Sequence, residues 1–312
     1  MERRGRHHGA PILIDAAPHR DVIPFVLGAA AVVALSALNR RRIARAVDAE
    51  YATQYATGAS GIAAGAEGYT LPSASGRALL LLHGSGDSPQ SLRYLATALN
   101  AAGYEVHAPL LPGHGRSPSA FAVTTAAEYH AAVSDELQAL VRRHAWTGVI
   151  GLSMGAALAT RAVSESTGVG ALVLLAPYMI PPPAVRATVR MAPLWSALVP
   201  FVRGRGDDSI HDAVASKQSR AYGTFSRGAL TALVTAADAG FQALPRIRVP
   251  TLVINSTQDN RIPRELAERV LGVITAPVEQ HWLDGCGHVI TADYCKDEVA
   301  TLVVAFLARH AG

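Results

Sequence analysis

The chain contains very little cysteine. Among its 312 residues only Cys286 and Cys295 are cysteines, which is too few for a framework of disulfide bonds and does not match the spacing of cysteine metal sites. A bond between these two residues stays possible. We nevertheless expect two free thiols, as is usual in a reducing compartment.

An excess of charge is also missing from most of the chain. Only 17% of the residues are charged, and the net charge is +4. Residues 1–50 hold eight arginines and five acids, whereas the remaining 262 residues hold 20 basic and 19 acidic side chains. No basic surface with interleaved aromatic residues is indicated, which excludes nucleic acid as a partner. Half of the residues are hydrophobic, enough for the core of one large domain or two small ones.

The first 76 residues differ in composition from the rest. Residues 1–21 are polar and aperiodic, and we predict a disordered tail. Residues 22–38 carry no charge and would span about 25 Å as a helix, so we predict a membrane anchor, with a cleaved signal sequence or a helix of the globular domain as alternatives. The arginines at 40–42 favour a cytoplasmic position for the domain that follows. Residues 39–76 are predicted to be a linker.

From residue 77 onward, apolar segments alternate with helical ones. The apolar segments at 78–82, 169–176 and 250–255 are typical of buried strands. Strands of this kind separated by helices predict an α/β fold, with a parallel sheet covered on both faces. Residues 178–246 interrupt the alternation with apolar helical stretches at 185–198 and 229–241. We predict a helical cap over the carboxyl ends of the strands, and an ordinary packing subdomain is the alternative.

One short motif lies where a strand turns into a helix. Residues 151–155 read G-x-S-x-G, with a β-branched segment before them and an alanine-rich segment after them. A serine on a sharp strand-to-helix turn exposes its hydroxyl, and the flanking glycines let the two backbones approach closely. This context indicates that Ser153 is a nucleophile, although the five-residue pattern alone would also fit a glycine-rich loop with a capping serine.

A nucleophilic serine needs a base and an acid that orients the base. His288 lies in a glycine-containing loop after the last expected strand, and we interpret it as the base. Asp259, which follows the strand segment 250–255, is the predicted acid. Asp293 is the alternative acid, although it also suits the first turn of a helix.

Most of the other histidines carry no such signal. Six of them, including His107 and His144, stand alone in expected helices or strands. We interpret these six as structural or exposed residues.

Five motifs occur in a fixed order: H-G-S-G at 83–86, P-G-H-G at 112–115, G-x-S-x-G at 151–155, D-N-R-I at 259–262 and G-H at 287–288. In this set and order, the chain resembles the α/β-hydrolase family over about residues 69–311. Residues 287–293 resemble its bacterial carboxylesterase and monoacylglycerol lipase branch. The resemblance implies the α/β-hydrolase fold, a mostly parallel sheet with helices on both faces and a helical cap.

The resemblance also assigns the catalytic roles. It makes the serine, histidine and aspartate named above a catalytic triad. It implies that the backbone N–H groups of Ser85 and Met154 bind the oxyanion, while His83 braces their loop. Related enzymes often carry a bulky apolar residue at the position of Ser85, so their acyl-chain preference does not carry over.

The expected activity is hydrolysis of a carboxylic ester through an acyl-serine, with no metal and no cofactor. The apolar insertion favours a small lipophilic ester, such as a monoacylglycerol, as substrate. An acyltransferase or thioesterase with the same triad is an alternative, and so is a non-catalytic lipid-binding protein. The sequence does not indicate an oligomeric state.

Overall fold

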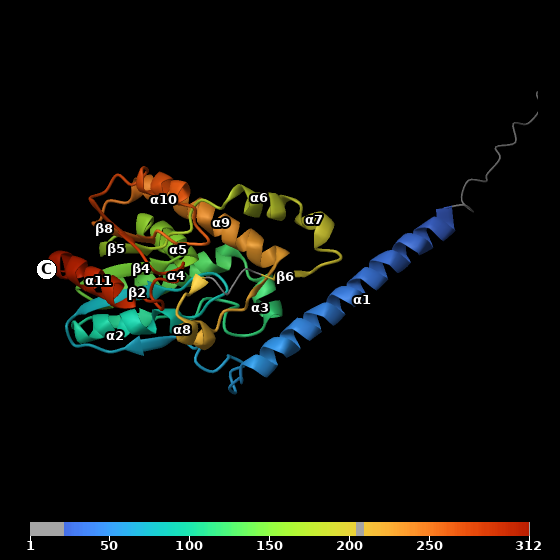
Figure 1. Ribbon diagram of the computed structural model, residues 1–312, viewed down its shortest axis with the longest axis horizontal. Helices are drawn as coiled ribbons and strands as arrows, with labels where there is room; N and C mark the ends of the chain where they lie inside the picture. Colours follow the sequence, from blue (N-terminus) through green and yellow to red (C-terminus); the bar gives the residue numbers. More distant parts are fainter. Residues whose placement is uncertain (1–21, 204–208, 312) are drawn as a thin grey trace, which may run out of the picture.

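The computed structural model describes residues 22–203 and 209–311; the tail predicted over residues 1–21 lies outside them. The centre of the described chain is a seven-stranded sheet with the order β1-β3-β2-β4-β5-β8-β9 (Figure 1). The strands are β1 (Tyr69–Leu71), β2 (Arg77–Leu82), β3 (Glu105–Ala108), β4 (Trp146–Leu152), β5 (Val169–Leu175), β8 (Thr251–Ser256) and β9 (Val278–Leu283). Strand β1 pairs antiparallel with β3, and the other pairings of this sheet are parallel. The predicted mostly parallel α/β sheet is confirmed.

Helices cover both faces of this sheet. Helices α2 (Arg93–Ala101) and α11 (Lys296–His310) pack against each other on one face, and α4 (Ala126–Arg143), α5 (Met154–Ser164) and α9 (Arg227–Ala243) pack together on the other (Figure 1). The shorter helices are η1 (Pro89–Leu92), α3 (Pro118–Val123), η3 (Leu244–Arg246) and α10 (Arg264–Leu271). Because the central strands are enclosed on both sides, their apolar residues run without alternation, as in the fully buried residues 78–82 of β2.

The chain makes the predicted insertion between β5 and β8. It contains α6 (Pro183–Arg190), α7 (Ala192–Trp195), β6 (Phe201–Arg203), α8 (Ala213–Gln218) and β7 (Thr224–Ser226), followed by α9. Part of it lies over the carboxyl ends of the strands, since the Tyr222 N–H donates to the Gly86 carbonyl and the Ser209 carbonyl accepts from the Val289 N–H.

The second predicted cap stretch, residues 229–241, lies elsewhere. It forms most of α9, which runs along α5 in the helical layer that flanks the sheet. The two helices are so close that a Cβ on Gly240 would lie 2.6 Å from the Cα of Ala157.

The N-terminal part of the described chain differs from the predicted linker at 39–76. A single helix, α1 (Val22–Gln54), runs through the predicted anchor and into this segment, and it projects away from the sheet (Figure 1). Its last turns pack on the domain through the buried Tyr51, and the Asp48 carboxylate accepts a hydrogen bond from the Ser119 N–H. Ala63 and Ala66 are also fully buried. The small residues that suggested a linker allow close packing here.

The membrane anchor predicted over residues 22–38 finds no support in the structure. In the part of the chain that is described, none of the helices combines the length and the apolar character that a membrane crossing requires.

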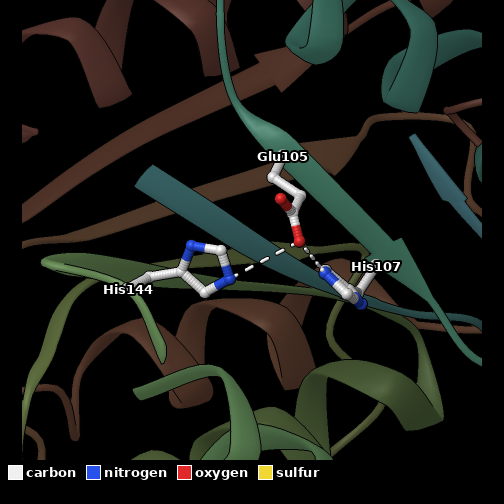
Figure 2. Close-up of side chains that lie close together, drawn as sticks. All are labelled: Glu105, His107 and His144. Carbon is white, nitrogen blue, oxygen red and sulfur yellow. Dashed lines mark hydrogen bonds and ion pairs between the residues drawn. The ribbon is translucent and has the colours of Figure 1, made fainter. Parts of the chain in front are cut away.

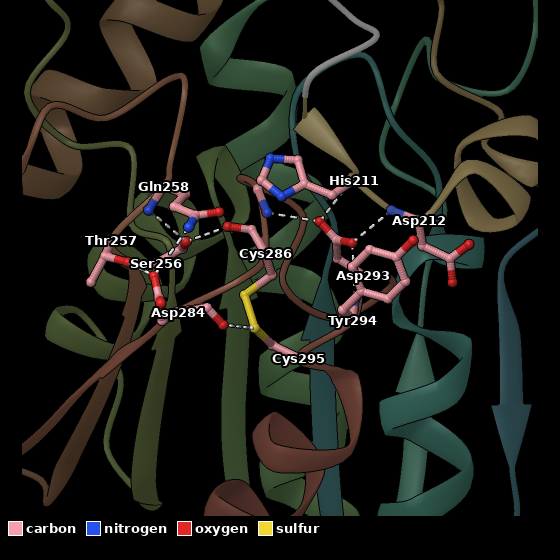
Figure 3. Close-up of a disulfide and its surroundings, with 11 residues drawn as sticks. His211, Asp212, Ser256, Thr257, Gln258, Asp284, Cys286, Asp293, Tyr294 and Cys295 are labelled. Carbon is pink, nitrogen blue, oxygen red and sulfur yellow. Dashed lines mark hydrogen bonds between the residues drawn. A yellow bond between two sulfur atoms is a disulfide. The ribbon is translucent and has the colours of Figure 1, made fainter.

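The prediction of two free thiols is wrong. Cys286 and Cys295 form a disulfide bond between the end of β9 and the start of α11 (Figure 3). The chain folds back over nine residues and brings the two Cα atoms to 5.8 Å, a distance that a disulfide spans readily. Disulfides persist in oxidising compartments and are rare in the cytosol, so the bond argues against the reducing compartment and the cytoplasmic placement that we predicted.

Candidate active site

Ser153 occupies a sharp turn between β4 and α5. Its φ of 56° and ψ of −117° are rare for a residue with a side chain and cost about 1–3 kcal/mol. The glycines on either side are required by crowding, since a Cβ on Gly151 would lie 2.4 Å from the Gly155 carbonyl oxygen, and a Cβ on Gly155 would lie 2.2 Å from the Leu82 carbonyl oxygen. The G-x-S-x-G pattern therefore sets the turn that directs the serine hydroxyl away from the sheet.

The structure brings together the three residues expected to form the triad. The Ser153 hydroxyl lies 2.8 Å from Nε2 of His288, and Nδ1 of His288 lies 2.7 Å from Oδ2 of Asp259. The three residues come from loops after β4, β9 and β8, which end at the same edge of the sheet. The His288 and Asp259 side chains are only 9% and 4% exposed. The geometry allows His288 to accept the serine proton while Asp259 accepts the Nδ1 proton.

The environment of Asp259 keeps its carboxylate ionised. Burial alone would raise the pKa of Asp259, but the hydrogen bond of His288, the charge that this ring carries when protonated, and two backbone amides lower this pKa below its usual value. The amides are those of Arg261 and Ile262, which donate to Oδ1 at 2.7 and 2.9 Å. One carboxylate oxygen is thus held by the loop, and the other is directed at the imidazole.

The loop at residues 83–87 lies against the serine. A Cβ on Gly84 would be 3.3 Å from the Ser153 Cβ. Nε2 of the buried His83 accepts a hydrogen bond from the Leu111 N–H at 3.1 Å, so its Nδ1 carries the proton and donates to the Gly84 carbonyl at 2.9 Å. Burial, with His114 nearby, lowers the pKa of His83 well below its usual value, so the ring stays neutral. His83 braces this loop, as the resemblance implied.

A second histidine also holds this loop, and sequence reasoning gave it no role. Nε2 of His114 accepts the Gly86 N–H at 3.0 Å, and Nδ1 donates to the Pro112 carbonyl at 3.0 Å. Burial lowers the pKa of His114 to about 4, which keeps the ring neutral. The P-G-H-G motif drew attention to His114, but the contact of His114 with Gly86 is visible only in the fold.

The two predicted oxyanion donors lie on either side of the serine. Met154 is the first residue of α5, where an amide has no acceptor within its own helix, and Ser85 lies in the loop next to Gly84. Within residues 22–203 and 209–311, neither backbone N–H has an acceptor in the protein. Both groups are therefore available to a ligand.

Asp87 is a further titratable residue beside the site that the sequence did not reveal. It is buried, and the Ser91 hydroxyl donates to its Oδ2 at 2.6 Å. Burial raises the pKa of Asp87 to about 6, although Ser91 and the charge of His288 oppose the shift. In the sequence Asp87 is indistinguishable from an ordinary turn residue.

Asp293, the alternative acid, is occupied by backbone amides. Its Oδ2 accepts hydrogen bonds from the N–H groups of His211 at 2.8 Å and Gly287 at 2.7 Å, and its Oδ1 accepts from those of Asp212 at 2.9 Å and Tyr294 at 2.8 Å (Figure 3). Burial alone would raise the pKa of Asp293, but these four bonds lower it below the usual value. The carboxylate joins the insertion to the loop that carries the histidine.

Comparison with known proteins identifies the family. The sequence profile of the alpha/beta hydrolase family matches residues 79–302. The chain belongs to the alpha/beta hydrolase family.

Two curated proteins are similar to the chain over most of their own length. A thermostable monoacylglycerol lipase from Bacillus sp. (strain H-257) is 28% identical over 235 residues, which cover 75% of the chain and 91% of the lipase. A carboxylesterase from Bacillus subtilis (strain 168) is 26% identical over 241 residues, or 75% of the chain and 93% of the esterase.

A solved structure agrees with this placement. It comes from work on LipS and LipT, two metagenome-derived lipolytic enzymes, and it superposes with a TM-score of 0.73 at 28% identity over 80% of the chain and all of the other protein. These similarities indicate that the chain is a hydrolase of the lipase and esterase type.

Proposed function

We propose that this alpha/beta hydrolase cleaves carboxylic esters through an acyl-serine intermediate, with Ser153 as nucleophile, His288 as general base and Asp259 as the acid that orients it. The observation that carries the proposal is the continuous chain of hydrogen bonds from Asp259 through His288 to the Ser153 hydroxyl. A buried, ionised carboxylate fixes the tautomer in which Nε2 is free to accept a proton.

The reaction proceeds in two steps. The Ser153 oxygen attacks the acyl carbonyl while its proton moves to Nε2 of His288, and the imidazolium then gives this proton to the departing alcohol. Water repeats the attack on the acyl-serine, again with His288 as base, and releases the carboxylic acid. Asp259 stabilises the imidazolium in both steps without taking its proton.

The negative oxygen of each tetrahedral intermediate is bound by the backbone N–H groups of Ser85 and Met154. Among the described residues neither amide has an acceptor, and the loop that carries Ser85 is held by His83 and His114. Donors that are fixed before the reaction lower the barrier without reorganisation, and removal of one such donor typically costs about 10²–10³ in rate.

The substrate we favour is a lipophilic ester such as a monoacylglycerol. The similarity to the monoacylglycerol lipase and to lipolytic enzymes supports this choice. So does Phe225, a partly exposed ring that lies beside Gly86 of the oxyanion loop.

The proposal is tested with a fluorophosphonate probe and a series of p-nitrophenyl esters of increasing chain length. Ser153→Ala should lose labelling and reduce turnover by roughly 10⁴–10⁶-fold while the protein stays folded. Ser166→Ala, two residues after the end of α5, is the matched control and should behave like the wild type. Turnover that survives in the Ser153→Ala variant would refute the assignment.

A further inference from the structure

Three potential metal ligands converge on the sheet away from the triad. Glu105 and His107 alternate along β3 with the buried Val106 and Ala108, so both side chains lie on the same face of the strand. His144 ends α4, two residues before β4 begins. Figure 2 shows the three side chains pointing towards one another.

The distances suit a single ion. Oε1 of Glu105 lies 2.6 Å from Nε2 of His107 and 3.5 Å from Nε2 of His144. One ligand atom from each residue lies within 4.8 Å of the others. A tetrahedral zinc ion with bonds of about 2.0–2.2 Å separates its ligand atoms by roughly 3.3 Å, so small side-chain rotations would bring all three atoms to an ion.

The surroundings favour a bound cation. The three side chains are only 11–18% exposed. Nε2 of His107 faces the Glu105 carboxylate, which is the position a metal-binding nitrogen requires. On the other side of the same ring, Nδ1 of His107 lies 3.4 Å from the Thr70 hydroxyl on β1. A partner of this kind on the second ring nitrogen is typical of metal-bound histidines, because it fixes the ring with the other nitrogen facing the ion.

We propose that Glu105, His107 and His144 bind a divalent transition-metal ion of the zinc class. Two imidazoles and one carboxylate match the donors that zinc takes, whereas calcium and magnesium prefer oxygen ligands alone. One ion would replace the proton that otherwise links His107 to Glu105.

The position of this site indicates a structural role. Glu105 and His144 lie at the amino ends of β3 and β4, whereas Ser153 follows the carboxyl end of β4. Seven residues of strand place the two ends about 20 Å apart. The ion would join β3 to the turn between α4 and β4, across the start of the intervening β2.

The test is a zinc titration of the metal-depleted full chain by calorimetry, with the melting temperature as a second readout. His7 and His8 are replaced by alanine in every sample, so that this adjacent pair cannot contribute to binding. The intact site should bind one equivalent of zinc and raise the melting temperature. His107→Ala and His144→Ala should each weaken binding at least tenfold and remove the thermal shift.

His281→Ala is the matched control. His281 and Glu279 have the same spacing on β9 and a contact of 2.9 Å, but in the described residues they are not part of a three-ligand group. Zinc binding should survive in this variant. If a histidine variant fails to fold, Glu105→Gln, which preserves the shape of the side chain, should show the same loss of binding. No saturable binding, or equal binding in all variants, would overturn the proposal.

Discussion

Replacement of Asp293 by asparagine should uncouple the insertion from the loop that carries His288. Each carboxylate oxygen of Asp293 accepts two backbone N–H bonds, and the residue is fully buried. In Asp293→Asn an NH₂ group replaces one oxygen and faces two donors, so two bonds are lost. At about 1.5–3 kcal/mol for each hydrogen bond to a charged group, the free energy of unfolding should fall by about 3–6 kcal/mol.

Activity should fall with stability, because one of the four donors is Gly287, the direct neighbour of His288. A displacement of about 1 Å in a catalytic group costs roughly 10²-fold in rate. Urea unfolding and kcat for a p-nitrophenyl ester measure the two effects separately. Asp238→Asn is the control, since this exposed aspartate pairs with Arg186 at the surface and such pairs contribute only about 0–1 kcal/mol. An Asp293→Asn variant within about 1 kcal/mol of the wild type, with unchanged kcat, would refute the reasoning.

The same bonds predict a pH dependence for the wild type. The pKa of Asp293 is lower in the folded protein than in the unfolded chain, so its stabilising contribution is present above the unfolded value of about 4 and is lost as the pH falls through the folded value. The difference in stability between the wild type and Asp293→Asn should therefore be largest near neutral pH and shrink in acid.

Two further predictions concern the neighbourhood of the proposed triad. Burial raises the pKa of Asp87 to about 6 in the folded protein, against 3.8 for the free side chain, so the wild type should lose about 2–3 kcal/mol of stability as the pH rises from 4 to 7. In urea unfolding at pH 8, Asp87→Asn should be more stable than the wild type. Identical pH profiles of stability for the two proteins would contradict this. The disulfide between Cys286 and Cys295 closes a loop of ten residues, so replacing both cysteines by serine should lower the free energy of unfolding by about 2–3 kcal/mol. The wild type in a strong reductant should show the same loss. A wild type whose stability is the same before and after complete reduction would argue against this contribution.

The alpha/beta sheet and the three residues of the proposed triad were predictable because their signals are local. The glycines around Ser153 mark it as a turn residue, and Asp259 and His288 each follow an apolar strand. The parallel topology alone therefore places all three residues at one edge of the sheet. The order of these motifs along the chain is enough to assign the three residues to one site.

The remaining features depend on how the chain folds back on itself, which no local pattern specifies. The partners of Asp293 include His211 and Asp212, about 80 residues away, and no local pattern distinguishes such a residue from the start of a helix. Whether Cys286 and Cys295 meet depends on how their loop closes. The segment before β1 misled the sequence interpretation because alanine and glycine suit flexible linkers and tight packing equally well.

The backbone at Ser153 places stability and activity in opposition. With φ at 56°, glycine would fit this turn with less strain than serine, yet glycine has no hydroxyl to offer His288. Selection for stability alone should therefore drift towards glycine at this position, and selection for turnover should hold the serine in place. An engineer who stabilises this scaffold by consensus or library screening should keep an activity assay in the selection. Otherwise a glycine at position 153 would be selected for stability although it removes the hydroxyl.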